Sequence, residues 1–506
     1  MTGKRLSALC AKINIEEEYG SGDPVITSLA YDSRDVNPGS LFFALRGIHA
    51  DGHGFIDKAI EQGARAVICM EMPSLPVPSA RYIRVADSRT AMSPIAAAFF
   101  DNPSEELKII GVTGTDGKST TSYFIQQLIE KSGRKCGLLT TVQFDFGDGP
   151  EKNFLRQSTP EATEIHRLLR RMRDNGCSYA VVEATSHGLS PVNNRLGDVR
   201  FDAGVLTNIS HEHLEFHKTL ERYMDDKANL FRALPADTGA AVINLDEPRR
   251  EVFSSASACP VFTYSLEDDL ADLFADDILE KNTVQQFNLH HHKKCSRVQL
   301  SLPGRFNVEN CLAALLGASL LTGTALPDLL PAVSALRAIR GRMVPVDCGQ
   351  PFQVIVDYAH TPGSFRKLFP GLRNQTEKRL IAVFGSAGER DLEKRPIQGE
   401  IASEFCDIII LTDEDPRGDE PQDILEEIAA GCSGMSRDET LYLIEDRPAA
   451  IRKAFSLARE GDTVILLGKG HEGSIIYQTG PVPWDEEKEA IRALNDFGYK
   501  SLKKTV

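Results

Sequence analysis

The sequence predicts an α/β fold in which helices cover parallel sheets and the chain is divided into several domains. From about residue 105 to 340, and again from about 341, short apolar segments alternate with segments of helical periodicity. A glycine-rich turn joins one apolar segment to a helix within Leu107–Thr121. The chain has 506 residues, more than a single core usually serves. We therefore expect three domains, over 1–104, 105–340 and 341–506.

The stretch Leu107–Thr121, LKIIGVTGTDGKSTT, indicates a binding site for ATP. An apolar strand leads into a turn with two glycines, and Lys118 opens the next helix. Backbone N–H groups and a helix N-terminus bind phosphate, the lysine reaches the terminal phosphates, and Ser119 can bind Mg²⁺. An ordinary glycine-rich turn is the alternative, and the placement of the lysine and serine disfavours it. The expected contacts are Gly114, Thr115, Asp116, Gly117, Lys118, Ser119 and Thr120.

Composition limits the class of partner. The formal net charge of −15 argues against nucleic acid, which needs a basic surface. We find no hydrophobic signal region after Met1 and no apolar run of about 18 residues, so we expect no membrane segment and a cytoplasmic location. We also expect a monomer. Ten cysteines without a C-x-x-C pair are expected to be reduced, and those in apolar segments to be buried.

The first 104 residues contain the elements of a small α/β unit. Leu41–Leu45 and Ala66–Cys69 read as strands, with a short helix from about Ile56 to Gly63. The polar loops Asp32–Arg34 and Gly47–Gly52 flank a buried strand, where ligand contacts are common. A role in capping and turning the chain explains these loops equally well.

The central region predicts a doubly wound parallel sheet. Its expected strands are Cys136–Thr141, Tyr179–Glu183, Ala203–Asn208 and Ala240–Asn244, and its expected helices are Glu161–Asn175 and Leu220–Leu234. Parallel strands end at one edge, so Glu183 and Asn208 should lie beside the glycine-rich turn. A carboxylate there suits Mg²⁺, although it can also cap the next turn.

Three other features of this region have both a functional and a plain interpretation. His213 lies in a loop with His211 and His217, where a hydrogen-bonded structural histidine is the ordinary alternative. Lys227 lies on an amphipathic helix and, taken alone, would be a surface lysine. The tract His290–Cys295 falls at the turn of an expected hairpin, and a solvated turn is favoured over a metal site.

The third region predicts another parallel sheet with polar strand ends. The expected strands are Phe352–Asp357, Leu380–Phe384, Asp407–Leu411, Thr440–Leu443 and Thr463–Leu467. Asp357–His360, Gly385–Arg395, Asp413–Arg417 and Gly468–Glu472 follow four of them. Reactive residues therefore end strands in two domains, which predicts one shared cleft.

The ordered series of motifs resembles the Mur ligase family, most closely its tripeptide-synthetase branch. Thr113–Thr121 follows the pattern TGTxGK(S/T)TT typical of these enzymes, with Val112 where the general phosphate-binding motif has glycine. The resemblance runs nearly end to end. Its other members are Asp32–Arg34, Glu183–Gly188, Thr207–Ser210, His213–Leu214, Tyr223–Lys227, Gly304–Asn310, Gly341–Met343, Val356–Pro362, Arg390–Arg395 and Gly468–Glu472.

The resemblance implies an architecture and a reaction. A central P-loop ATPase domain with a parallel sheet would be flanked by an N-terminal UDP-sugar-binding α/β domain and a C-terminal Rossmann-like domain that binds an amino acid. ATP would phosphorylate the D-Glu carboxylate of UDP-MurNAc-L-Ala-D-Glu, and the amine of a diamino acid would displace the phosphate. Mg²⁺ would neutralise the anions, and CO₂ would convert Lys227 into a carbamate.

The resemblance also implies site residues at matching positions. Lys118, Glu183, His213 and Lys227 would be catalytic; Ser119, Glu183, His213 and the Lys227 carbamate would bind Mg²⁺; Asn307, Asn310 and Arg342 would hold the nucleotide; Ser33, Ser158, Thr159, Thr185 and Arg195 would bind the UDP-muramoyl dipeptide, with the loop Gly47–Gly52 at the uridine; and Arg390, Glu414, Asp415, Pro416, Arg417, Gly468 and Glu472 would bind the amino acid.

Two positions depart from the family pattern. The loop from Leu189 to Arg195 is about two residues longer than usual, which affects the alignment of Arg195. Enzymes that add meso-diaminopimelate usually have Asp-Asn-Pro-Arg where this chain has Glu414-Asp415-Pro416-Arg417. The extra negative charge of Asp415 would repel a second carboxylate and favour a distal ammonium, as in lysine or ornithine, while the two arginines leave diaminopimelate open.

Two other functions remain as alternatives. A folylpolyglutamate synthase uses the same acyl-phosphate chemistry, but that family begins at its ATPase domain, whereas this chain has Asp32–Arg34 and an N-terminal α/β unit. A non-catalytic ATP-binding homologue is the other, and intact Lys118, Glu183, His213 and Lys227 argue against it.

Overall fold

The computed structural model describes residues 3–47, 50–155, 157–210, 217–281, 284–389 and 392–500. The chain separates into two compact units. The first contains Met1–Phe274, His290–Lys293 and Asn310–Ala332, and the second contains Ala275–Leu289, Lys294–Glu309 and Val333–Val506. The division into three domains at residues 104 and 340 stays a prediction.

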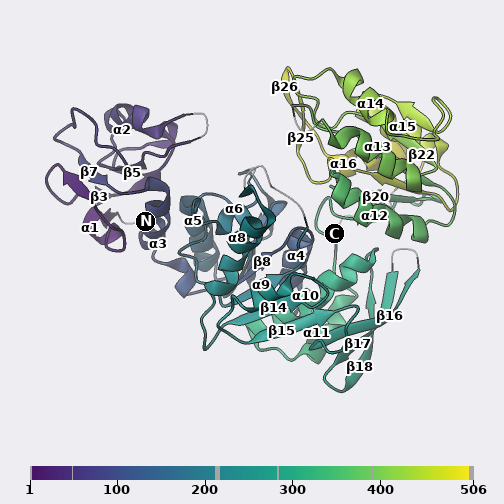
Figure 1. Ribbon diagram of the computed structural model, residues 1–506, viewed down its shortest axis with the longest axis horizontal. Helices are drawn as coiled ribbons and strands as arrows, with labels where there is room; N and C mark the ends of the chain where they lie inside the picture. Colours follow the sequence, from purple (N-terminus) through teal and green to yellow (C-terminus); the bar gives the residue numbers. More distant parts are fainter. Residues whose placement is uncertain are drawn as a thin grey trace. The chain divides into compact units, whose positions relative to one another are not determined.

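The N-terminal part of the first unit is a small α/β sheet (Figure 1). Its strands run in the order β2 (Glu17–Tyr19), β7 (Arg81–Arg84), β6 (Ala66–Cys69), β5 (Ser40–Phe43) and β4 (Ser28–Ala30), with β4 to β7 parallel. The remaining elements are β1 (Lys4–Arg5), which pairs with β3 (Val25–Ile26), and the helices α1 (Leu6–Leu9), α2 (Ile56–Glu61) and α3 (Ser88–Phe99). The fully buried run Ser40–Phe43 explains why this strand was predictable from its apolar residues.

The central sheet is built around the parallel strands that carry the glycine-rich turn. Strand β8 (Lys108–Thr113) lies between β12 (Tyr179–Glu183) and β13 (Ala203–Leu206), with β9 (Cys136–Leu139) beyond β12 and β14 (Ala240–Asn244) beyond β13. All of these neighbours are parallel, as predicted. The helices are α4 (Lys118–Lys131), α5 (Ala162–Asp174), α6 (Ser186–Leu189), α8 (Leu220–Arg232), α9 (Arg250–Ser254), α10 (Arg305–Thr322) and α11 (Leu326–Val333).

The two edges of this sheet depart from the parallel pattern. On one side β10 (Gln143–Asp145) and β11 (Pro150–Lys152) add an antiparallel hairpin that the sequence did not predict. These strands are three residues long and partly polar, so they carry little periodicity. On the other side β15 (Val261–Ser265) and β16 (Leu273–Lys281) still pair in parallel, and β17 (Val284–His291) and β18 (Lys294–Leu300) follow as a hairpin. The turn between β17 and β18 contains His292, which confirms the expected hairpin.

The second unit holds a sheet in the order β19 (Val344–Pro345), β20 (Gln353–Val356), β24 (Thr463–Leu466), β21 (Leu380–Phe384), β22 (Ile408–Leu411) and β23 (Leu441–Leu443). Strands β20 to β23 run parallel in this order. The helices are α12 (Pro362–Gln375), α13 (Lys394–Phe405), α14 (Pro421–Ala429), α15 (Arg447–Leu457) and α16 (Glu486–Asp496), and a hairpin pairs β25 (Ser474–Tyr477) with β26 (Gly480–Pro483).

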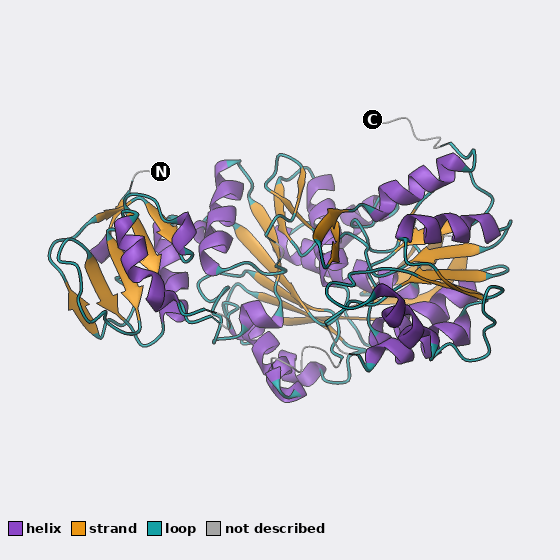
Figure 2. Cartoon of the chain, turned by 90° about the horizontal axis from the view of Figure 1, so that it is seen from above, coloured by secondary structure: helices purple, strands orange, loops and turns teal. Residues whose placement is uncertain are grey.

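Side-chain alternation along these strands builds two cores. Ile355, Ala382 and Ile409 pack with residues of α12, α13 and α14, whereas their neighbours Val354, Ile381 and Ile408 pack with residues of α15 and α16. Because successive strand residues point to opposite faces, a sheet buried on both sides reads as continuous apolar sequence. Figure 2 shows these strands in orange between purple helices.

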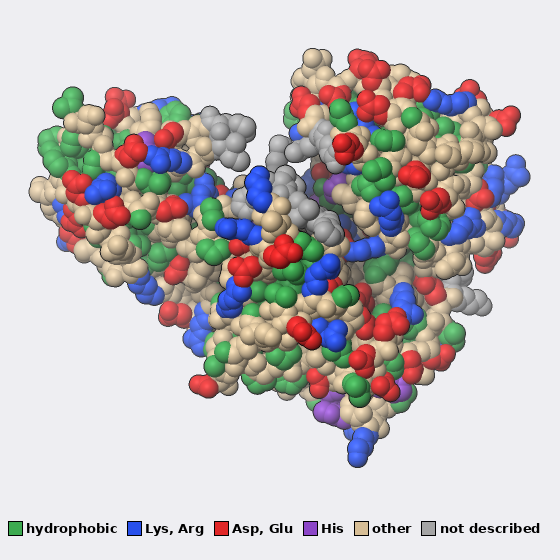
Figure 3. Space-filling view, in the orientation of Figure 1, with side chains coloured by type: hydrophobic (Ala, Val, Ile, Leu, Met, Phe, Trp, Pro, Cys, Tyr) green, Lys and Arg blue, Asp and Glu red, His purple; other side chains and the backbone are tan. Residues whose placement is uncertain are grey.

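The charged side chains on the surface and the state of the cysteines agree with what the composition predicted. Acidic and basic side chains are interspersed on the face shown in Figure 3. In the part of the chain that the structure describes, no helix is both long enough and apolar enough to cross a bilayer. All ten cysteines are free thiols, and all but Cys295 are buried. Burial raises the pKa of the Cys69 thiol to about 11, which keeps it protonated and unreactive.

Candidate functional site

The glycine-rich turn forms a phosphate loop, Gly114–Ser119, between β8 and α4. Gly114 has φ +141°, and a Cβ there would lie 1.9 Å from Thr207 Oγ1; Gly117 has φ +80°, and its Cβ would lie 2.4 Å from Asn310 Oδ1. Both positions therefore require glycine. The first intrahelical bond runs from Thr121 N–H to Gly117 O, at 2.8 Å. The N–H groups of the first turn of α4 thus emerge at the helix end, where they can bind an anion.

The loop after β13 supports the phosphate loop from one side. Asn208 accepts from Thr115 N–H through its main-chain oxygen at 2.7 Å and from Asp116 N–H through Oδ1 at 3.0 Å. Thr207 Oγ1 donates to Asp116 O at 2.6 Å. Strand β13 ends at Leu206, two residues earlier than predicted, because Asn208 uses its groups on the loop. The prediction that Asn208 lies beside the loop is confirmed.

Glu183 and Ser119 meet below the loop. The Ser119 hydroxyl donates to Glu183 Oε2 at 2.7 Å, and Thr141 donates to the same carboxylate from its N–H at 2.9 Å and its hydroxyl at 3.0 Å. Glu183 is 3% exposed, and Thr185, not Glu183, caps the next helix, α6. A hydroxyl and a carboxylate at this spacing are the oxygen ligands that Mg²⁺ prefers, so the residues fit the ion.

Lys227 is buried against the phosphate loop, which excludes the surface-lysine alternative. The side chain is 1% exposed, its Nζ donates to Gly114 O at 2.6 Å, and it lies 4.5 Å from the centre of the Tyr223 ring. Residues 223, 227, 230 and 231 share the buried face of α8. Lys118 Nζ donates to Thr115 O at 2.7 Å, so the two lysines approach the loop with their amino groups.

Of the histidines in the loop after β13, the structure describes only His217. His217 Nδ1 lies 2.9 Å from Asp226 Oδ2, and Nε2 lies 2.9 Å from Ser186 Oγ. All three side chains are buried, and they connect α6 with α8 next to Lys227. His213, predicted as catalytic and metal-binding, lies outside the described residues. Within the described residues, no three His, Cys, Asp or Glu side chains gather so that they could hold a metal ion.

Three residues predicted for the UDP-muramoyl dipeptide lie together beside Glu183. Thr159 Oγ1 donates to Glu183 O at 3.0 Å and lies 2.9 Å from Thr185 Oγ1. Arg195 donates from Nη1 to Thr159 O at 2.9 Å and from Nη2 to Glu161 Oε1 at 2.7 Å. The longer loop before Arg195 therefore still delivers the guanidinium to this cluster. Its buried Nε has no hydrogen-bond partner in the part of the chain that is described.

The other two residues predicted for this substrate are Ser158 and Ser33, and the described contacts do not join them to the cluster beside Glu183. Ser158 is half-buried next to Thr159. Ser33 is buried and follows β4, while the loop that begins at Gly47 follows the parallel neighbour β5. Carboxyl ends of parallel strands meet at one edge, so these two loops share an edge of the N-terminal sheet.

The nucleotide residues are divided between the units. Asn310 Oδ1 accepts from Thr121 Oγ1 at 3.1 Å, one helical turn into α4. Asn307 Nδ2 donates to Pro303 O at 2.6 Å in the second unit. In the same unit the Arg342 guanidinium lies 4.6 Å from the centre of the Tyr358 ring. A shared cleft and the nucleotide roles of Asn307 and Arg342 stay predictions.

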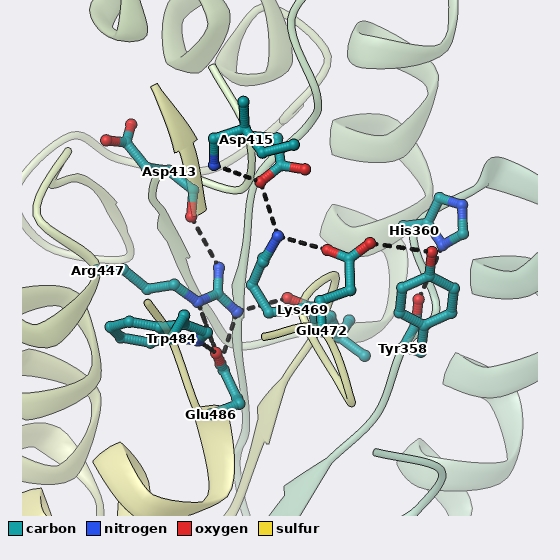
Figure 4. Close-up of polar contacts among 11 residues, drawn as sticks. Tyr358, His360, Asp413, Asp415, Arg447, Lys469, Glu472, Trp484 and Glu486 are labelled. Carbon is teal, nitrogen blue, oxygen red and sulfur yellow. Dashed lines mark hydrogen bonds and ion pairs between the residues drawn. The ribbon is translucent and has the colours of Figure 1, made fainter. Parts of the chain in front are cut away.

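The amino-acid motif residues come together in the second unit, where Lys469 links them (Figure 4). Lys469 is fully buried, donates to Asp415 Oδ1 at 2.7 Å and forms a second ion pair with Glu472. Asp415 Oδ1 also accepts from Ile476 N–H at 2.9 Å. Gly468 and Glu472 were predicted from the sequence as contacts for the amino acid, whereas Lys469 was not. Its place in the Gly-Lys-Gly turn after an apolar strand was the available signal.

Glu414 presents an unpaired carboxylate oxygen at this cluster. Its side chain is 6% exposed, and Oε2 has no hydrogen-bond partner among the described residues. Burial raises the pKa of Glu414 to about 7, against the attraction of Lys394 and Lys469. Gly468 has φ +93°, and a Cβ there would lie 2.6 Å from Glu414 Oε2, so glycine is required beside it.

Pro416 and Arg417 complete the motif. Gly388, after β21, packs so closely that a Cβ there would lie 1.9 Å from Pro416 O. Arg417 has φ +56°, and its N–H donates to Ile476 O at 2.9 Å. The buried Nε of Arg417 lacks a hydrogen-bond partner in the described ranges. Arg390, the second arginine predicted for the amino acid, lies outside them.

Comparison with known proteins adds a family assignment. Family models match residues 25–100 (Mur ligase family, catalytic domain), 112–318 (Mur ligase middle domain) and 341–470 (Mur ligase, glutamate ligase domain). A UDP-N-acetylmuramyl-tripeptide synthetase of Roseiflexus sp. (strain RS-1) is 48% identical, covering 94% of this chain and 96% of the relative. The same-named protein of Borreliella burgdorferi is 46% identical, with coverages of 97% and 98%.

A solved structure is similar over the same length. It is the structure of a UDP-N-acetylmuramoyl-L-alanyl-D-glutamate–2,6-diaminopimelate ligase, which is 28% identical with a TM-score of 0.68. The similarity covers 99% of this chain and 100% of that one. The predicted α/β fold with a central parallel sheet is confirmed.

Proposed function

This chain belongs to the Mur ligase family, and we propose that it is an ATP-dependent ligase of peptidoglycan precursor synthesis. It joins a diamino acid to the D-glutamate of UDP-MurNAc-L-Ala-D-Glu. The observation that carries this proposal is the meeting of Ser119 and Glu183 beneath the phosphate loop, with Thr159, Thr185 and Arg195 directly beside them. A phosphate site and a carboxylate-binding arginine are what phosphorylation of a carboxylate requires.

The reaction proceeds in two steps. A γ-carboxylate oxygen of D-Glu attacks the γ-phosphorus of ATP, and ADP leaves, which gives an acyl phosphate. The amine of the diamino acid then attacks the acyl carbon, loses a proton and expels phosphate, which keeps the carboxylate oxygen. Lys118 and the N-terminus of α4 hold the transferred phosphoryl group, and Arg195 orients the carboxylate.

Mg²⁺ fits at Ser119 and Glu183. When bound, the ion supplies charge neutralisation between the γ-phosphate and the attacking carboxylate. The chain's own residues prepare this position, because Thr141 fixes the Glu183 carboxylate with two hydrogen bonds and Ser119 is fixed by the first turn of α4. His213 belongs to the proposed ligand set by resemblance.

We further propose that Lys227 is carbamylated. Its neutral amine adds CO₂ and releases a proton, so that the amine becomes a carbamate with one N–H and a carboxylate. The remaining N–H would keep the hydrogen bond that Nζ now donates to Gly114 O at 2.6 Å, and the carboxylate oxygens would be available to hold Mg²⁺. Burial of Lys227 supports this, since a carbamate in an enclosed site is protected from loss of CO₂.

The charge at the amino-acid motif favours a distal ammonium on the substrate. One lysine, Lys469, faces two carboxylates, Asp415 and Glu472, so this trio keeps one negative charge. Glu414 adds a carboxyl with an unpaired oxygen. We therefore propose lysine or ornithine over meso-diaminopimelate, whose distal carboxylate would meet this charge. Arg417 and Arg390 bind the α-carboxylate in this proposal.

Phosphate release tests the proposal. The purified protein is assayed with ATP, Mg²⁺, UDP-MurNAc-L-Ala-D-Glu and, separately, lysine, ornithine or meso-diaminopimelate, with each component omitted in turn. We expect phosphate to be released only when all components are present. We also expect a new product that is heavier than UDP-MurNAc-L-Ala-D-Glu by one amino-acid residue. Release with a folate substrate and glutamate instead, or no release with any amino acid, overturns the proposal. We expect the enzyme to act in the cytoplasm, and light scattering to give a monomer's mass.

A further inference from the structure

The two loops that carry the amino-acid motifs are tied together by a buried ion pair outside those motifs. Arg447 is the first residue of α15 and Glu486 the first of α16, and both side chains are fully buried. Arg447 donates from Nε to Glu486 Oε2 at 2.9 Å and from Nη2 to Oε1 at 2.6 Å, a bidentate pair (Figure 4).

The same guanidinium grips the main chain at the start of both motifs. Arg447 Nη1 donates to Asp413 O at 3.0 Å, and Nη2 donates to Leu467 O at 2.6 Å. Asp413 directly precedes Glu414, and Leu467 directly precedes Gly468. These segments follow β22 and β24, which are separated in the sheet by β21. Strands two places apart lie roughly 10 Å from each other and share no ladder bonds, so Arg447 supplies a connection that the sheet does not.

Glu486 extends the connection to the far end of the second loop. Trp484 Nε1 donates to Glu486 Oε2 at 2.6 Å, and Trp484 N–H donates to Gly473 O at 2.9 Å. Gly473 directly follows Glu472. The segment Gly468–Glu472 is thus held at its start by Arg447 and at its end through Glu486 and Trp484.

We propose that Arg447 and Glu486 are positioning residues for the amino-acid site: they set the distance between Glu414–Arg417 and Gly468–Glu472. The inference rests on the proposed function of these two loops. Neither residue needs to touch the substrate. A buried ion pair seldom adds net stability compared with apolar side chains, whereas fixed geometry at two backbone carbonyls is something that only a planar, multidentate donor provides.

Arg447→Lys tests this positioning. Lysine keeps the charge, but a single ammonium cannot hold Glu486 and both carbonyls in the same planar arrangement. We expect KM for the amino acid to rise at least tenfold, while KM for ATP and for the UDP-muramoyl dipeptide change less than twofold. Glu486→Gln keeps the shape and one acceptor oxygen, and should give the same pattern at about threefold. It is the milder second variant in case Arg447→Lys folds poorly.

The matched control is Arg452→Lys. Arg452 lies on the same helix α15 and pairs with Glu489 and Asp496 of α16, but the described contacts do not link it to either motif loop. Trp484 is the single tryptophan of the chain, so its fluorescence reports directly on the network. Emission should shift in Arg447→Lys and Glu486→Gln and stay unchanged in Arg452→Lys.

The outcomes separate this inference from the proposed function. No amino-acid-dependent phosphate release by the wild type would refute the proposed function and this inference with it. Wild-type turnover with an unchanged amino-acid KM in both Arg447→Lys and Glu486→Gln would refute the positioning role alone. An equal rise in the KM of all three substrates, or the same rise in Arg452→Lys, would show a general structural role and also overturn it.

Discussion

Glu414 gives a quantitative prediction about pH. Burial raises its pKa to about 7 from an ordinary 4.5, and its Oε2 has no partner among the described residues. If this carboxylate binds an ammonium of the incoming amino acid, it must be ionised to do so. The attacking amine must also lose one proton. Below about pH 7 two protons must therefore leave, and above it only one.

The expected size follows from that pKa. A plot of log(kcat/KM) for the amino acid against pH should have a slope of about 2 below pH 7 and about 1 above it. At pH 6 about a tenth of Glu414 is ionised, so kcat/KM should lie about tenfold below the line extrapolated from higher pH. Glu414→Gln should give a slope of about 1 throughout, with lower kcat/KM at pH 8.

The raised pKa of Glu414 also predicts how the free energy of unfolding changes with pH. The folded-state pKa is raised, so the contribution of Glu414 to stability is fully present below pH 4.5 and is lost as pH rises to about 7. Each pH unit of that interval is worth about 1.4 kcal/mol, or about 3 kcal/mol in total. Glu414→Gln should gain relative stability over this range. A wild-type profile of slope 1 across pH 6–8, or an unchanged break in Glu414→Gln, would refute the reasoning.

Three other substitutions test separate parts of the site, and a fourth, at the buried His166 of α5, tests the effect of burial on stability. Lys227→Ala should abolish turnover, with partial recovery on adding short carboxylates, and full activity without them would exclude the carbamate. Gly114→Ala forces a Cβ to 1.9 Å from Thr207 Oγ1 and should lower ATP-dependent turnover at least a hundredfold. The control Gly133→Ala should not, because Gly133 also has a positive φ, +81°, but its Cβ would meet nothing within 4 Å. Asp415→Asn should shift competition between lysine and meso-diaminopimelate towards the latter, by about 1–3 kcal/mol in kcat/KM. Burial lowers the pKa of His166 from an ordinary 6.5 to about 3, so the folded protein loses stability as the pH falls from 6.5 towards 3. In urea unfolding, the stability of His166→Leu relative to the wild type should therefore rise by about 1.4 kcal/mol for each pH unit of that fall.

The strands that could be predicted from the sequence are those in which nearly every residue is apolar and buried. β6, β12 and β21 begin and end at the predicted residues, because each is a short, almost fully buried run made mostly of apolar side chains. The hairpin β10–β11 was missed because three-residue strands carry no usable period. The position of the phosphate loop and of Glu183 followed from the rule that parallel strands end at one edge.

What the sequence did not reveal depends on contacts between distant residues. The burial of Lys227 depends on which face of α8 packs against the sheet. A lysine in an amphipathic segment is normally assigned to the exposed face, so the sequence alone did not predict its burial. The pairing of Asp415 with Lys469 joins residues 54 positions apart. Arg447 lies outside every recognised motif and acts on backbone carbonyls, which leave no mark in the sequence.

Transfer of an oxygen atom tests the central claim most directly. UDP-MurNAc-L-Ala-D-Glu is labelled with ¹⁸O in the γ-carboxylate and turned over with ATP, Mg²⁺ and the preferred amino acid. Because the carboxylate oxygen attacks phosphorus and departs with phosphate, the released phosphate should carry one ¹⁸O atom. Unlabelled phosphate, formed at the same rate as the product, would contradict the acyl-phosphate mechanism and the roles assigned here to Lys118, Glu183 and Arg195.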